Sequence, residues 1–63
     1  MIRLELTLEE AQELANVLQE YLSELRAEIS ATDSHDFKEQ LKTEKRELID
    51  IQTKLSALLS EEA

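Results

Sequence analysis

Two apolar stripes with helical spacing constrain this chain more than any other feature. The first stripe recurs at spacings of three and four residues and contains Ala11, Leu14, Ala15, Leu18, Tyr21, Leu22, Leu25 and Ile29. The second contains Phe37, Leu41, Leu48, Ile51, Leu55, Leu58 and Leu59, with Glu44 at the stripe position between Leu41 and Leu48. This spacing is typical of amphipathic helices. Since the chain has no glycine and no proline to interrupt them, the sequence predicts an all-α fold.

Capping signals predict where the first helix begins. Thr7 can accept from amides at a helix start, and Glu10 has the spacing to reach back and close a capping box. We therefore expect a helix over residues 8–31. Before it, residues 2–6 alternate apolar and polar side chains, so residues 1–7 are expected to form an extended or β arm.

The stretch "ATDSHDF" (residues 31–37) separates the two stripes. Its Thr, Asp and Ser residues favour caps and turns, so we expect a turn over 32–35 and a second helix over 36–60. Asp36 with Glu39 has capping-box spacing, and Thr32 or Asp33 is the alternative cap one turn earlier. Residues 61–63 are expected to fray, because acidic residues at a helix C-terminus oppose the helix dipole. We expect the 63 residues to form one domain, an antiparallel helical hairpin.

The same stretch also holds the best candidate for chemistry. His35 is the only histidine, and Asp33 and Asp36 flank it. A metal site needs three or four converging ligands, which adjacent turn residues seldom provide, and the chain has no cysteine and no second histidine. We therefore predict no catalytic residue, no metal site and no cofactor, and we do not expect an enzyme or a small-molecule substrate.

A reversal of the chain near Asp33 predicts the pairing of the two helices. Residues whose numbers sum to about 66 then lie side by side, which brings apolar residues together, for example Leu25 with Leu41. The same rule pairs Glu28 with Lys38, Glu24 with Lys42 and Glu20 with Arg46. Exposed pairs of this kind are each worth only about 0.2–1 kcal/mol, but they would fix register and account for the basic cluster.

Two polar residues remain after this pairing. Glu44 falls beside Tyr21, whose hydroxyl is its nearest predicted donor, with Lys45 as another, and such a polar break is typical of a residue that fixes register. A general acid or base is the alternative role for Glu44. Arg26 has no acidic neighbour three or four residues away, so we expect it to reach across a dimer interface or to an external carboxylate.

Each stripe is wider than one neighbouring helix can cover. The pairing leaves Val17, Leu22, Ile49 and Leu59 in water, and two hairpins facing each other would bury such surplus faces. We therefore predict a homodimeric four-helix bundle. The two N-terminal arms would pair antiparallel across the two-fold axis or lie along the other subunit.

Net charge limits the partners. The chain carries 15 acidic and 7 basic residues, a net charge of −8, which repels nucleic acid and anionic membranes. It has no apolar run of membrane-spanning length and no signal-peptide pattern, so we expect a cytoplasmic protein.

The run from Leu18 to Ile29, followed by Thr32-Asp33 and residues 37–42, resembles a group of short bacterial helical-hairpin proteins that read "YLSxLRxEIxxTDxxxF". The resemblance covers about two-thirds of the chain and implies a helical hairpin in a bacterial cytoplasm, without an activity. It also selects Tyr21, Arg26, Glu28, Thr32 and Asp33 as candidate interaction or structural residues, to which the pairing argument adds Glu44. The predicted function is a non-enzymatic interaction module or small regulator. The alternative is an acidic, antitoxin-like inhibitor that masks a basic protein surface.

Overall fold

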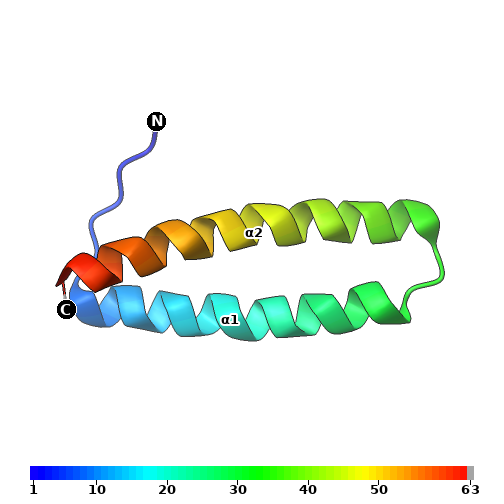
Figure 1. Ribbon diagram of the computed structural model, residues 1–63, viewed down its shortest axis with the longest axis horizontal. Helices are drawn as coiled ribbons and strands as arrows, with labels where there is room; N and C mark the ends of the chain where they lie inside the picture. The colour runs from blue at the N-terminus through cyan, green and yellow to red at the C-terminus, as the bar shows by residue number, and fades with distance from the viewer. Residues whose placement is uncertain (63) are drawn as a thin grey trace.

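The computed structural model describes residues 1–62 and shows two antiparallel helices packed side by side. Helix α1 spans Leu8–Ala31 and α2 spans His35–Glu62, with the connecting turn at the end of the hairpin opposite both termini (Figure 1). The predicted all-α, two-helix architecture is confirmed. The chain measures 42 × 24 × 14 Å, so the hairpin is one layer of helices thick.

The predicted start of α1 is confirmed by its cap. The Thr7 hydroxyl accepts from the Glu10 amide at 3.1 Å, and the Thr7 amide donates to Glu10 Oε1 at 2.9 Å. These bonds satisfy two amides that a bare helix end leaves unpaired. At the other end, Thr32 leaves the helical conformation while its amide still donates to the Glu28 carbonyl at 3.0 Å.

The predicted bounds of α2 are wrong at both ends. Helix α2 begins at His35 because Ser34 caps it: the Ser34 hydroxyl accepts from the Phe37 amide at 3.3 Å, and the Ser34 carbonyl accepts from Lys38 at 2.9 Å. None of the three expected caps (Thr32, Asp33, Asp36) takes this role. The helix continues to Glu62 instead of fraying after residue 60, and Ala63 lies outside the described residues.

Five leucines form the core between the helices: Leu18, Leu22, Leu25, Leu41 and Leu55. Leu22 is only 2% exposed, which corrects the prediction that it stays in water. Of the other residues expected in water, Val17 is exposed, whereas Ile49 and Leu59 are half-buried. The interface therefore runs closer to Leu22, and farther from Tyr21, than the stripe alone suggested.

Polar side chains line much of the α2 face that meets α1. Lys38, Lys45 and Gln52 recur every seven residues, as residues on one side of a packed helix do, and all three are half-buried. Long side chains of this type cover apolar surface with their methylene stems and keep their polar ends in water. The apolar part of this seam is thereby reduced to the row Leu41, Leu48 and Leu55.

The N-terminal arm packs only at its base. Residues 1–7 precede α1 without regular secondary structure, and the described residues contain no β-strand. Exposure falls along the arm, from 95% at Ile2 to 73% at Leu4 and 38% at Leu6. The arm therefore presents three nearly bare apolar side chains to solvent, those of Met1, Ile2 and Leu4.

Candidate interaction surface

A hydrogen bond between the helices identifies one flank of the hairpin. The Tyr21 hydroxyl donates to Glu44 Oε1 at 2.6 Å, which confirms Tyr21 as the predicted donor to Glu44. Positions seven residues apart lie on nearly the same side of a helix. Leu14 therefore shares this flank with Tyr21, and Phe37, Ile51 and Leu58 share it with Glu44.

Apolar side chains on this flank remain open to solvent. We call them the apolar flank and define it as Leu14, Val17 and Tyr21 of α1 with Phe37, Ile51 and Leu58 of α2. Five of the six are between 42% and 58% exposed, and Leu14 is half-buried. Scattered exposed apolar residues are ordinary, but several exposed apolar residues gathered on one flank are typical of a protein contact surface.

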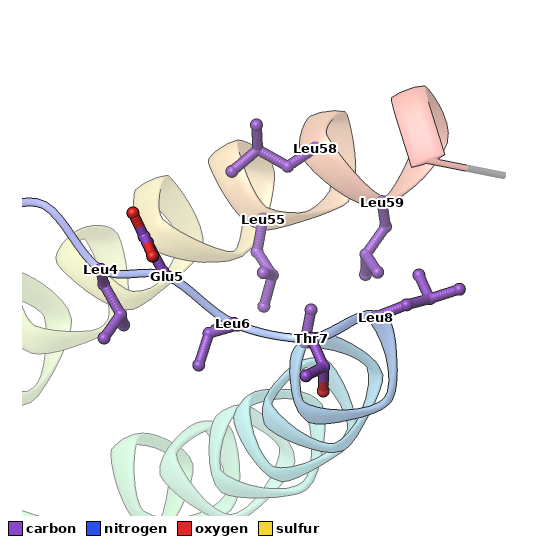
Figure 2. Close-up of a pocket in the computed structure, with 9 residues that line it drawn as sticks. Leu4, Glu5, Leu6, Thr7, Leu8, Leu55, Leu58 and Leu59 are labelled. Carbon is purple, nitrogen blue, oxygen red and sulfur yellow. The ribbon is translucent and has the colours of Figure 1, made fainter.

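An open groove of about 490 Å³ lies at the end of the hairpin that holds both termini, which we call the open end. Its apolar lining comes from Leu4, Leu6, Leu8, Ala11, Leu55, Leu58 and Leu59. Leu4 and Leu6 project from one edge of the arm and Glu5 from the other (Figure 2). Because Leu58 belongs to both features, the groove is continuous with the apolar flank.

The opposite flank is polar and basic. A second groove of about 410 Å³ there is lined by Ile29 and Ile49 with the charged residues Glu39, Lys42, Lys45 and Arg46. The predicted ion pairs between the helices are absent. Among the side chains of residues 1–61, the only ion pairs within 4.0 Å are Lys42–Glu39 at 4.0 Å and Lys54–Asp50 at 3.1 Å, both within α2.

The glutamates and lysines miss each other because they lie on opposite flanks. Glu24 and Glu28 lie close enough to Tyr21, on the apolar flank, to raise its pKa. Lys42 and Arg46 line the groove on the other side. The basic cluster therefore does not fix the register of the hairpin. The Tyr21–Glu44 contact and the leucine core have that role.

Carboxylates raise the pKa of Tyr21 above its ordinary value of 10.0. The largest cause is the hydrogen bond that the phenol donates to Glu44, followed by the negative charge of Glu44 and then by smaller effects that include Glu28 and Glu24. Both effects favour the neutral phenol over the phenolate. The tyrosine is therefore a hydrogen-bond donor throughout the neutral pH range.

The other candidate residues cluster around the turn without forming a chemical site. Thr32 is half-buried and its hydroxyl accepts from the Ser34 amide at 3.3 Å, whereas Asp33 is exposed. Glu28 and Arg26 are exposed residues of α1, and Glu28 uses its carbonyl to end the helix. Within residues 1–61, no three histidine, aspartate or glutamate side chains converge as metal ligands would.

Comparison with protein-family models, with curated proteins and with solved structures gives no match to this chain. The resemblance to short bacterial hairpin proteins stays a prediction. Within the described residues, neither helix is long and apolar enough to cross a membrane.

The sequence alone did not identify the apolar flank. Its signal is the seven-residue series Phe37, Glu44, Ile51 and Leu58, which runs beside the core row of Leu41, Leu48 and Leu55. Their spacing of three and four residues predicts a single stripe. The structure separates them, since one row is in the interface and the other is beside it.

Proposed function

We propose that the chain is a non-enzymatic interaction module or small regulator that works as a homodimeric helical bundle. The observation that carries the proposal is an apolar flank on a hairpin only 14 Å thick. Domains are generally built from two packed layers around a core, and one layer of helices leaves an apolar side uncovered. A second copy supplies the missing layer in a four-helix bundle.

The exposed area is consistent with this assembly. A compact monomer of 7.3 kDa exposes about 4,200 Å², whereas this chain exposes 5335 Å². The excess of about 1,100 Å² exceeds the roughly 800 Å² that each partner buries in a protein interface of standard size. One contact over the apolar flank and the groove would remove it.

Sedimentation equilibrium at micromolar concentration tests the proposal, with a mass of twice 7.3 kDa expected. Ile51→Gln should weaken the dimer. Full burial of an isoleucine is worth about 1.5–3 kcal/mol, and Ile51 is 47% exposed, so its loss costs about 1 kcal/mol in each subunit. The loss in both subunits, about 2 kcal/mol, should raise the dissociation constant of the dimer about 30-fold.

Ala57→Gln is the matched control, because Ala57 is exposed on the same helix, about half a turn from both Leu55 and Leu59. It should leave the dissociation constant unchanged. A wild-type chain that sediments as a folded 7.3 kDa monomer would refute the proposal.

One observation favours the acidic inhibitor as a second candidate. The chain has 15 acidic residues, and the ion pairs among residues 1–61 use only Glu39 and Asp50. Free surface carboxylates steer and hold a basic partner. Binding of this kind to a basic protein would weaken steeply as salt is added, whereas binding through the apolar flank would not.

A further inference from the structure

The exposed apolar side chains are concentrated at one end of the hairpin. Of the ten large apolar side chains that are exposed, eight lie in the half that holds the termini: Met1, Ile2, Leu4, Leu6, Leu8, Val17, Ile51 and Leu58. Only Tyr21 and Phe37 lie at the middle or toward the turn. The apolar surface is thus a patch at the open end that includes the arm, rather than an even strip.

Carboxylates occupy the other half of the same flank. Glu24 and Glu28 lie close enough to Tyr21 to raise its pKa, and Glu44 accepts its hydrogen bond. A partner packed with its open end over these three carboxylates would press leucine and isoleucine side chains onto them. That arrangement removes water from charged groups without giving them a partner, which is costly.

We propose that two copies pack side by side with their open ends together, and that the arm of each chain covers the apolar end of the other. This inference rests on the proposed homodimer and specifies its orientation. The two patches then bury each other, while the carboxylates remain hydrated near the turn. Ile2 and Leu4, which gain little from their own chain, pack against the partner, and the two arms lie side by side where their free backbone groups can pair.

The orientation has an electrostatic consequence. The open half, residues 1–19 and 47–62, contains eight of the 15 acidic residues but only two of the seven basic residues. Bringing two such halves together is opposed by charge repulsion, which salt screens over about 8 Å at physiological ionic strength. The dimer should therefore tighten as salt is added.

The distance between two spin labels, one at the same position in each subunit, measures the orientation. Two matched serines provide the label positions. Ser60→Cys places a label near the open end and Ser30→Cys places one near the turn; both serines are exposed, and the chain has no native cysteine. For labels on the outer sides of two layers about 10 Å apart, open ends together give about 25–30 Å for Ser60→Cys, and a longer distance for Ser30→Cys because water separates the carboxylates of the two layers near the turn. Open ends apart add the axial offset, which gives about 40–50 Å.

The outcomes separate the two proposals. A monomer without label–label coupling refutes the homodimer and the orientation together. A dimer in which Ser60→Cys gives about 40–50 Å refutes only the orientation.

Leu4→Gln and Glu5→Gln test the arm with the same new residue on its two edges. Leu4→Gln should raise the dissociation constant about tenfold or more, because a nearly bare leucine loses its apolar burial in both subunits. Glu5→Gln should leave it unchanged or lower it slightly. Equal affinities for the two variants would refute the contact of the arm with the partner.

Discussion

Leu22 is the residue on which the packing of the hairpin depends most clearly. It is 2% exposed and lies between the helices, where the sequence had suggested a solvent position. Truncation of a buried leucine to alanine costs about 2–5 kcal/mol through lost burial and the remaining cavity. At about 0.05–0.15 kcal/mol per residue, 63 residues give a total stability of roughly 3–9 kcal/mol. Leu22→Ala should therefore remove at least about a fifth of the free energy of unfolding, and about half of it at the middle of both ranges.

Urea unfolding followed by circular dichroism measures this loss. Wild type and variant are compared at the same chain concentration, because self-association would add to the apparent stability. Gln19→Ala is the control, since Gln19 is exposed on the same helix, and its effect should stay within about 0.5 kcal/mol. If Leu22→Ala changed the unfolding free energy no more than Gln19→Ala does, the helices would not pack through Leu22 and the register described above would be wrong.

Two further predictions concern the turn and the flank. Ser34→Ala should destabilise the chain by about 1 kcal/mol in the same urea assay, because it removes the cap of α2; Asp36→Ala should have a smaller effect, and the reverse order would contradict the capping assignment. Tyr21 is the only tyrosine, so ultraviolet absorbance reports its ionisation directly, at a pKa above 10.0 that Glu44→Gln lowers. Because the folded-state pKa is raised, the Tyr21 contact stabilises the fold fully below pH 10.0 and is lost as the pH rises through the folded-state pKa; an unchanged titration in Glu44→Gln would contradict this.

Local signals in the sequence predicted the features that depend on a few neighbouring residues. Thr7 and Glu10 are three residues apart, and their two hydrogen bonds need nothing from the rest of the chain. Tyr21 and Glu44 are 23 residues apart in sequence, yet their contact could be predicted from the reversal of the chain near Asp33. Antiparallel pairing through a short turn leaves little freedom along the helix axes, so axial register was predictable.

Rotation about the helix axes was not predictable in the same way. The first stripe is wide enough that either of its edges can face α2, and the pairing rule says only which residues are level with each other. The structure turns Leu22 inward and leaves Val17 and Tyr21 at the edge. That choice depends on the packing of all five core leucines together, which no local pattern encodes.

The error in the charge pairing has the same origin. Glu24 and Lys42 are level along the axis, as the pairing requires, but the observed rotation places them on opposite flanks. An exposed ion pair contributes about 0.2–1 kcal/mol, whereas a buried leucine contributes about 1.5–3 kcal/mol. With five leucines buried, the core decides the rotation and the charges follow it.

The same comparison of magnitudes explains why α2 does not fray where its last residues are acidic. Unfavourable charges at a helix C-terminus cost about 0.3–1 kcal/mol each, and Leu59 is half-buried in the groove beside the arm and the first turn of α1. Packing of Leu59 therefore holds the last turn in place against the dipole. Because Leu58 projects to the apolar flank from this turn, the contact that orders the end of α2 also positions an exposed leucine for a partner. Stability of the open end and recognition at the open end thus depend on the same turn of helix.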